Sequence, residues 1–336
     1  MAPNPPKLAT IYDVADLAGV SHITVSRVVN GKQNVSPETR ERVLKAMNEL
    51  GYSPNPIAKT LQTRRSQVIE LVTTDVWGSS AAMQSVISAV AQGFDFQLSI
   101  LPTTVDALYN VLKAIPNRMV AGTLLYAQDV DLNYGTVQQI VQNYPLVQLG
   151  GRLQSGLPSV TYDQYQASTL AVQHLIDLGH REIGFIGGQQ RLLDGRIRYE
   201  AYLDTLQRNH LKAGPSIFGD FGAPSGEVVM KELLARQQPF TALFISSDSM
   251  ALSAIHVMRQ AGLRVPEDVS VVGYDDDIFA SFLSPPLTTM VNNAGLLARL
   301  AAEYLFELLQ NPQTPRMQRI LLPELILRQS TRPPQP

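Results

Sequence analysis

The sequence contains no cysteine and a single tryptophan among its 336 residues. The absence of cysteine excludes disulfides, thiolate metal sites and a cysteine nucleophile. We expect no membrane span, because Arg299, Glu303 and Glu307 interrupt the apolar run at 298–309. The first ten residues, MAPNPPKLAT, lack the apolar region of a signal peptide, so we expect a cytoplasmic protein.

The net charge of −2 is small, but the charges are unevenly distributed. Residues 1–66 contain nine Lys or Arg against five Asp or Glu, whereas the remainder contains eighteen against twenty-four. A basic head on an acidic body is typical of a module that contacts phosphates, joined to a domain that does not. The composition, 45% apolar and 17% charged, is that of a soluble globular chain, and the length suggests two or three domains.

Residues 10–31, TIYDVADLAGVSHITVSRVVNG, have the pattern of two short helices joined by a tight Gly-Val turn. Thr10 and Asp13 have the spacing of a capping box, and Gly19 ends the first helix. Ser21 can cap the second helix, which ends before Asn30-Gly31. The pattern predicts a helix-turn-helix. The alternative is an ordinary amphipathic helix pair, because apolar spacing of this kind is common in helical proteins.

The outward face of the second predicted helix carries residues suited to reading DNA. The first residues of a recognition helix face base edges in the major groove, so we expect His22 and Ile23 to read bases. Arg27 is expected to donate to guanine or phosphate, and Ile23 can meet a thymine methyl. The expected DNA contacts in this region are Thr10, Tyr12, Ser21, His22, Ile23, Ser26, Arg27 and Asn30.

A third helix is predicted to begin after Ser36, which can cap it. Its buried face is predicted to consist of Val43, Leu44, Met47 and Leu50. Gly51 occupies the left-handed position that commonly ends a helix. Asn55 can cap a shorter helical segment that extends to the basic pair Arg64-Arg65. Together these segments predict a compact helical head.

From residue 67 the pattern changes to short β-branched runs that alternate with longer helical patterns. Such alternation predicts an α/β body with parallel sheets, whose ligands bind beyond the carboxyl ends of the strands. The predicted strands are VIELVT, QLSIL, GTLLYA, LVQLG, EIGFIG, TALFIS and VSVVGYD. Polar residues follow several of these strands, namely Asp75, Arg152, Ser247, Asp248 and Asp275.

These motifs occur in an order that resembles the LacI/GalR family of bacterial transcription regulators. In the head they are TVSRVVNG, VSPETRERV and LGYSPNPIAKTL, and in the body VQHLIDLGHREIGFIGG, FTALFISSDSMALSAI, GLRVPEDVSVVGYDD and PPLTTM. The resemblance extends over nearly the whole chain. The GDF, GYDD and PPLTT segments are most similar to the lactose-repressor type.

The resemblance implies three parts. Residues 1–54 would form the helix-turn-helix DNA-binding domain, 55–66 a hinge helix and linker, and 67–336 a two-lobed, periplasmic-binding-protein-like domain for effector binding and dimerisation. The N-lobe is expected at about 67–162 and 293–321, and the C-lobe at about 163–290 and 322–332. A homodimer would place two heads on a pseudo-palindromic operator. The proline-rich ending QSTRPPQP shows no apolar heptads, which favours a dimer over a tetramer.

In the hinge, the resemblance gives Leu61 the position of the leucine that such regulators insert into the minor groove, with Ala58 beside it. Asn55 completes the expected DNA contacts of this segment. An inserted apolar residue kinks DNA at a cost that extra protein contact offsets. The alternative is that Leu61 only packs the hinge.

For the effector pocket, the matching positions carry residues that suit a sugar. Arg198 and Asp275 would donate to and accept from vicinal hydroxyls, and Phe221 would offer an apolar face to a pyranose. The expected effector-binding residues are Trp77, Asp194, Arg198, Phe221, Ser247, Asp275 and Asn292. Trp77 could contact the ligand or pack in the core. Asp194 could orient Arg198 or contact the ligand.

At two expected sugar-binding positions the sequence differs from the family pattern. Ser247 replaces a frequent Asn or Asp, and Gly150 stands where a lactose-type regulator carries Asp, so the contacts to hydroxyls differ. Of the acidic triplet at 275–277 only the first residue matches a ligand position, and Asp276 and Asp277 are expected to be caps or solvated.

The resulting hypothesis is a nucleoid-associated transcriptional repressor of a carbohydrate-utilisation operon. A sugar inducer, such as a β-galactoside or β-glucoside, would release it from the operator. A corepressor-dependent regulator that binds another metabolite is one alternative. A sugar-active enzyme with a DNA-binding head is another, although we find no phosphate-cradling motif and no nucleophile-base pair. No metal spacing occurs, so we expect no metal, no cofactor and no catalytic residues.

Overall fold

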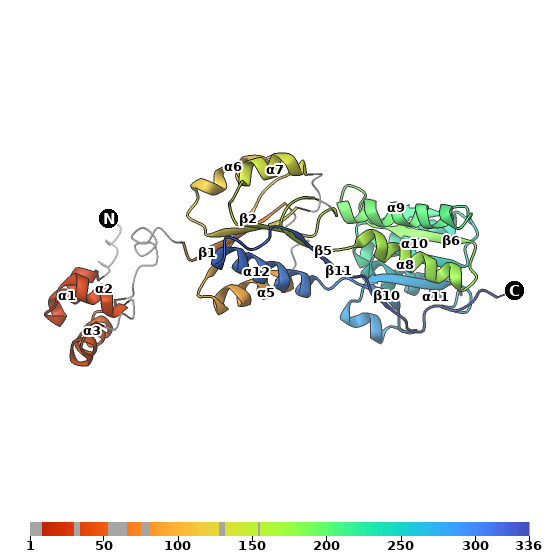
Figure 1. Cartoon of the computed structure of the whole chain (residues 1–336). Helices are drawn as coiled ribbons and strands as arrows, with labels where there is room; N and C mark the ends of the chain where they lie inside the picture. Colours follow the sequence, from red (N-terminus) through yellow and green to blue (C-terminus); the bar gives the residue numbers. More distant parts are fainter. Residues whose placement is uncertain are drawn as a thin grey trace, which may run out of the picture. The chain divides into compact units, whose positions relative to one another are not determined.

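The chain divides into two units, Met1–Gln67 and Val68–Pro336, and each is described here by itself. The computed structural model describes residues 9–29, 34–52, 66–74, 81–127, 132–153 and 155–335. Within these ranges no helix is long and apolar enough to cross a membrane. Figure 1 shows helices in the first unit, and two sheets flanked by helices in the second.

The described part of the first unit is helical, with α1 (Ile11–Ala18), α2 (His22–Val29) and α3 (Pro37–Glu49). The predicted capping box is confirmed at the start of α1. There the Thr10 hydroxyl accepts from the Asp13 amide at 3.3 Å, and Asp13 Oδ2 accepts from the Thr10 amide at 2.7 Å. Gly19 then ends the helix at φ +63°, a conformation that costs glycine little. Ser21 accepts from the Thr24 amide at 3.2 Å and so caps α2.

The three helices bury one apolar cluster. It consists of Val14, Ala15, Ala18, Val25, Val28, Val43 and Ala46. Leu44 and Leu50, predicted to be buried, are 52% and 37% exposed. The prediction was wrong because the inward stripe of α3 passes from Val43 to Ala46 and Met47, and Leu44 lies about 100° around the helix from Val43.

The first sheet of the second unit, with its helices, forms the N-lobe. Its order is β2-β1-β3-β4-β5-β11, and every neighbouring pair is parallel. The strands are β1 (Val68–Thr73), β2 (Gln97–Pro102), β3 (Gly122–Tyr126), β4 (Leu146–Leu149), β5 (Ser159–Tyr162) and β11 (Gln318–Leu321). The helices are α5 (Ala81–Gly93), α6 (Leu108–Ala114), the 3-10 helix η1 (Ile115–Asn117), α7 (Tyr134–Val141) and α12 (Ala294–Gln310).

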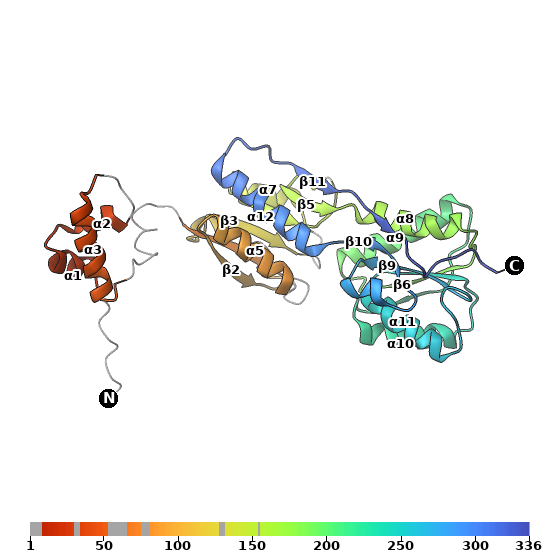
Figure 2. The ribbon, with the colours of Figure 1, turned by 90° about the horizontal axis from the view of Figure 1, so that it is seen from below.

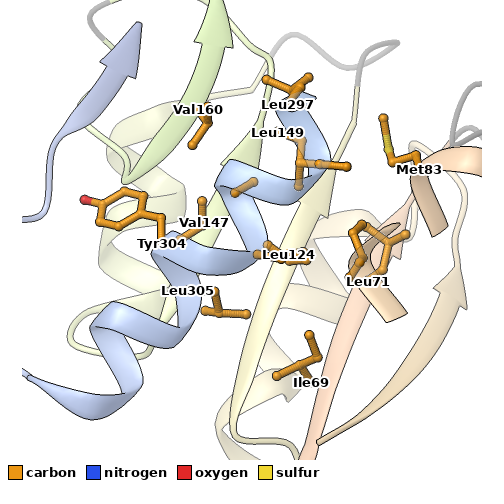
Figure 3. Close-up of a cluster of buried hydrophobic side chains, with 14 of the residues drawn as sticks. Ile69, Leu71, Met83, Leu124, Val147, Leu149, Val160, Leu297, Tyr304 and Leu305 are labelled. Carbon is orange, nitrogen blue, oxygen red and sulfur yellow. The ribbon is translucent and has the colours of Figure 1, made fainter. Parts of the chain in front are cut away.

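Helices cover both faces of the N-lobe sheet, which explains why its central strands β1, β3 and β4 are rich in apolar residues. Successive side chains of β3 point to opposite faces: Leu124 packs against α5 and α12, and Leu125 packs against α6 and α7. Figure 3 shows how Leu297, Tyr304 and Leu305 of α12 lie over the strands. A helix from late in the chain therefore completes the core of the first lobe.

The second sheet and its helices form the C-lobe. Its order is β7-β6-β8-β9-β10-β12, parallel except for the antiparallel pair β10 and β12. The strands are β6 (Ile183–Gly187), β7 (Ser216–Phe218), β8 (Ala242–Ile245), β9 (Ser270–Asp275), β10 (Thr288–Val291) and β12 (Leu325–Ile326). The helices are α8 (Gln164–Asp177), α9 (Leu193–Arg208), α10 (Ala223–Ala235), α11 (Asp248–Gln260) and the 3-10 helix η2 (Ile278–Phe282). Figure 2 shows α8 and α9 on one face of this sheet and α10 and α11 on the other.

The chain passes between the two sheets at three places. β5 leads into α8 at 163, β10 leads into α12 at 292–293, and β11 leads into β12 at 322–324. We call these the first, second and third crossing segments. In each sheet the strand order also reverses, between β1 and β3 and between β6 and β8. Such switch points are where open α/β sheets bind ligands.

Candidate functional site

The first candidate surface lies on α2 of the head. His22, Ile23 and Arg27 are exposed, Ile23 by 53%, and Ser26 is half-buried. Tyr12 of α1 is 61% exposed, and its ring centroid lies 5.1 Å from that of His22. This ring contact connects Tyr12 of α1 with the face of α2 that the sequence pattern placed outward.

The opposite face of α2 packs against the rest of the head. Val25 and Val28 are buried in the head core. Arg42 of α3 donates to the carbonyls of Ala18 and Gly19 at 2.7 and 3.3 Å, and thereby satisfies the end of α1. The turn that aims α2 is therefore held by the third helix as well as by its own glycine.

The second candidate site is a pocket of about 1030 Å³ in the second unit. Its walls are the loops that follow β6, β7, β8 and β9, joined by Tyr126 at the end of β3 and by the second crossing segment. Among the predicted effector residues, Asp194, Arg198, Phe221, Ser247, Asp275 and Asn292 line it. The pocket therefore lies at the carboxyl ends of the C-lobe strands and also involves the N-lobe.

Arg198 of α9 is the central cation of this pocket, and its side chain is only 3% exposed. Its Nη2 lies 3.6 Å from Asp194 Oδ2, and its Nη1 lies 3.7 Å from Asp275 Oδ1. Nη1 also donates to the Ser246 carbonyl at 2.5 Å, and the guanidinium carbon lies 3.7 Å from the centroid of the Tyr274 ring. The guanidinium is thus fixed on several sides, with one carboxylate on either side.

Asp275 ends β9 and faces the guanidinium. Its position on the pocket floor raises the pKa of its carboxyl to about 6, because burial outweighs the opposing effects of Arg198 and of a hydrogen bond from Asn292. That bond runs from Asn292 Nδ2 to Asp275 Oδ1 at 3.0 Å. At neutral pH the carboxylate is therefore available as an acceptor.

Phe221 supplies an apolar wall and adopts φ +75°, which is unusual for a bulky residue. Ser247 stabilises this conformation: its hydroxyl donates to the Phe221 carbonyl at 2.8 Å and accepts from the Met250 amide at 3.1 Å. The ring lies against Gly188, where an added Cβ would come within 2.1 Å of it. Ser247 thus caps α11 and positions the aromatic wall.

The acidic loop after Asp275 differs from the expectation. Asp276, expected to be a cap or solvated, forms an ion pair with Arg328 Nη2 at 2.7 Å. No pattern in the sequence indicated this partner, because the C-terminal segment returns to this edge of the C-lobe sheet through β12, a contact that spans 52 residues of sequence. Asp277 donates its backbone amide to Asp248 Oδ2 at 2.9 Å, and burial raises the pKa of Asp248 to about 8.

His174 and His180 contact the C-terminal segment. His174 Nε2 lies 3.1 Å from the Thr331 hydroxyl, and His180 Nε2 lies 2.9 Å from the Arg332 carbonyl. Burial lowers the pKa of both imidazoles. The two rings therefore hold the end of the chain on the C-lobe.

Comparison with known proteins assigns each of the two sites to a known type of domain. Residues 10–55 match the bacterial regulatory proteins of the lacI family, and residues 172–331 match the periplasmic binding protein-like domain. The HTH-type transcriptional repressor PurR of Pasteurella multocida (strain Pm70) is 33% identical over 339 residues, which cover 97% of this chain and 99% of the relative. The chain belongs to the LacI family. It is a transcription regulator with a DNA-binding helix-turn-helix and a ligand-binding body.

Solved structures of other LacI-family proteins show the same architecture. The lac repressor dimer bound to operator and the anti-inducer ONPF matches with a TM-score of 0.89 and 31% identity, covering 97% of this chain and 100% of that one. A complex of the transcriptional regulator CelR with cellobiose matches with a TM-score of 0.68 and 32% identity, covering 96% of this chain and 99% of the other.

Several predicted site residues lie outside the described residues. These are Asn30, Asn55, Ala58, Leu61 and Trp77. The insertion of Leu61 into the minor groove and the contact of Trp77 with an effector therefore stay predictions.

The structure also places Tyr126, Gln164 and Tyr274 at or beside the pocket, and the sequence analysis named none of them. Tyr126 and Tyr274 could have been found, because both lie at the carboxyl ends of predicted strands. Gln164 follows β5, a four-residue strand that the pattern did not reveal.

Proposed function

We propose that this LacI-family protein is a dimeric repressor that is released from a pseudo-palindromic operator by an uncharged β-glucoside or β-galactoside. The observation that carries the proposal is the buried Arg198 between Asp194 and Asp275, next to the ring of Phe221. Donors and acceptors fixed beside an aromatic face suit a pyranose, which has hydroxyls at its rim and an apolar C–H face. The relative that was solved with cellobiose, the transcriptional regulator CelR, supports this class of ligand.

The charge of the pocket favours a neutral effector. The carboxylates that line it are Asp194, Asp220, Asp275, Asp276 and Asp277, and the guanidiniums are those of Arg191 and Arg198. Asp194 and Asp275 already face Arg198, so an anionic sugar would meet a cation that is neutralised and a surplus of negative charge. We therefore expect uronates and sugar phosphates to bind much more weakly than neutral glycosides.

Release of the operator follows from differential binding. An effector that prefers the operator-free arrangement of the dimer by about 100-fold would shift the equilibrium by about 2.7 kcal/mol. The proposed readers are His22, Ile23 and Arg27, which α2 presents outward. We propose no catalytic role for the pocket carboxylates, because the cation between Asp194 and Asp275 suits binding better than proton transfer.

The test begins with a thermal-shift screen of the full chain, since a bound ligand raises the apparent stability by mass action. The panel contains cellobiose, o-nitrophenyl β-galactoside, glucuronate and hypoxanthine. We expect one of the neutral glycosides to raise the melting temperature of the wild type but not that of Arg198→Leu, and glucuronate to leave both unchanged. Hypoxanthine represents the alternative of a metabolite that is not a sugar. If hypoxanthine alone raises the melting temperature, the sugar proposal is contradicted.

The second step measures operator affinity by fluorescence anisotropy, with a duplex selected from a randomised pool by the full-length protein. The glycoside that binds is expected to weaken the complex. If it strengthens the complex, the protein is a corepressor-dependent regulator. Hydrolysis of the glycoside during the incubation, detected by chromatography, would instead indicate an enzyme.

A further inference from the structure

One side chain connects the pocket to the segments that join the lobes. Gln164 is the first residue of α8, directly after the first crossing segment. Its Oε1 accepts from Arg198 Nε at 3.0 Å and from the Tyr274 hydroxyl at 2.6 Å. Its Nε2 donates to Asn292 Oδ1 at 3.4 Å, in the second crossing segment. Gln164 therefore contacts the central cation of the pocket and a connection between the lobes at the same time.

The orientation of every amide in this chain of contacts is determined. A guanidinium has only donors, so Arg198 requires the oxygen of Gln164 on its side. The Gln164 amide nitrogen must then face Asn292, whose oxygen accepts and whose own nitrogen donates to Asp275 at 3.0 Å. Asp275 lies 3.7 Å from Arg198, which closes the ring of contacts. A shift of either charged residue must move or break an amide contact.

The three crossing segments are also connected with one another. The Asp163 amide donates to the Leu321 carbonyl at 3.4 Å, which joins the first segment to the end of β11, where the third begins. The amide of Val291, the last residue of β10, donates to the Glu324 carbonyl at 2.9 Å, which joins the start of the second segment to the third. The contact between Gln164 and Asn292 joins the first to the second. Gln164 therefore belongs to one set of hydrogen bonds that joins all three crossing segments, and breaking its contacts alters that set.

We propose that Gln164 is the positioning residue that couples an effector at Arg198 and Asp275 to the crossing segments, and so to the relative arrangement of the lobes. This inference rests on the proposed function for the identity of the effector. An effector that draws Arg198 or Asp275 toward its hydroxyls competes with the contacts of Gln164 and Asn292. Binding then alters the hydrogen bonds that join the segments between the lobes.

The experiment compares three variants of the full-length protein. Gln164→Met removes the amide at similar size. Gln164→Glu keeps an acceptor toward Arg198 and Tyr274 but cannot donate to Asn292. Gln166→Met alters an exposed glutamine in the same turn of α8 and serves as the matched control. Melting temperatures establish that all three variants are folded.

The first measurement is amide hydrogen exchange of residues 291–294 without any ligand. We expect exchange about tenfold faster in Gln164→Met and Gln164→Glu than in the wild type, and no change in Gln166→Met. Unchanged exchange in both Gln164 variants would overturn the proposal, because Gln164 would then not hold the second crossing segment.

The second measurement uses cellobiose as the probe. Its affinity is measured by calorimetry, and the ratio of operator dissociation constants with and without saturating cellobiose is measured by anisotropy. At saturating cellobiose this ratio is expected to fall about tenfold in Gln164→Glu, and calorimetry gives the concentration that saturates each variant. A ratio equal to that of the wild type would contradict the coupling. If cellobiose does not affect the wild-type complex, the proposed β-glucoside response fails, and the ligand-free exchange measurement still decides the role of Gln164.

Discussion

The recognition surface of the head and the pocket of the body are built in opposite ways. The head surface comes from residues 12–27, on two adjacent helices, and its side chains point outward from a small core. The pocket is lined by residues between Tyr126 and Ala294 from both lobes, and its central cation is buried. A surface made by one helix pair can lose a residue without collapse. A pocket built around a buried charge cannot, because every neighbour is matched to that charge.

The largest expected effect is that of Arg198→Leu. Removing the cation leaves Asp194 and Asp275 without their shared partner, which costs about 3 kcal/mol or more for a buried pair. We expect cellobiose affinity to fall by about 100-fold or more, and the pKa of Asp275 to rise further. Calorimetry measures the affinity, and Arg198→Lys is the matched control for charge. Undiminished binding by Arg198→Leu would show that the pocket does not depend on this cation.

Arg27→Ala tests the other side of the comparison. A lost contact to guanine or phosphate is expected to weaken operator binding by about 10- to 100-fold, or roughly 1–3 kcal/mol. Cellobiose affinity should not change. Lys45→Ala, which removes an exposed cation from α3, is the control and should have a smaller effect. Equal losses in both variants would mean that only the overall charge of the head matters.

Gly188→Ala tests the contribution of the Phe221 ring to binding separately from that of the charged residues. The added methyl would come within 2.1 Å of the Phe221 ring, so the ring must move. We expect about tenfold weaker cellobiose binding and an unchanged operator affinity without ligand. Gly93→Ala, where an added Cβ meets nothing within 4 Å, should leave both affinities unchanged.

The raised pKa of Asp275 predicts a pH dependence of effector binding. Because the pKa is about 6, the carboxylate is mostly charged at pH 7 and mostly protonated at pH 5. Cellobiose affinity should therefore fall by about tenfold between these two values, since a protonated carboxyl accepts hydroxyl hydrogens poorly. Calorimetry at both pH values checks this. Asp275→Asn should bind weakly at both, and a wild type with equal affinity at pH 5 and 7 would contradict the assignment.

The smallest expected effect concerns the cap of the head. Thr10→Ala removes one side of the capping box of α1 and should destabilise the head by about 1 kcal/mol. Thermal unfolding followed by circular dichroism should show a lower transition for the head and an unchanged one for the body. Thr10→Ser keeps the hydroxyl and should restore the transition, and an equal loss in both variants would argue against a capping role.

Much of the fold could be predicted from the sequence. All seven predicted strands are present, because each carries a run rich in apolar residues, and all but the half-exposed edge strand β2 are buried in the sheets. The missed strands β5, β7, β10, β11 and β12 contain only two to four residues, some of them polar, such as TTMV. These strands are buried by the elements that pack on them, and that packing cannot be predicted from a few residues of sequence.

The candidate site was predictable in part. Arg198, Phe221 and Asp275 do line one pocket, as the family resemblance implied. The role of Ser247 in holding Phe221, and the pairing of Asp276 with Arg328, were not visible in the sequence. Both depend on which backbone carbonyl or which distant side chain comes within reach.

The sequence alone determined the features that local chemistry controls. The capping box of Thr10 and Asp13, the break at Gly19 and the outward face of α2 all follow from side chains within a few residues of one another. Only the tertiary structure decided that Leu44 is exposed and that Gln164 meets Asn292 across 128 residues of sequence. The physical reason is that a hydrogen bond needs a matched donor and acceptor within about 3.5 Å, and for residues so far apart only the path of the chain between the lobes brings them together.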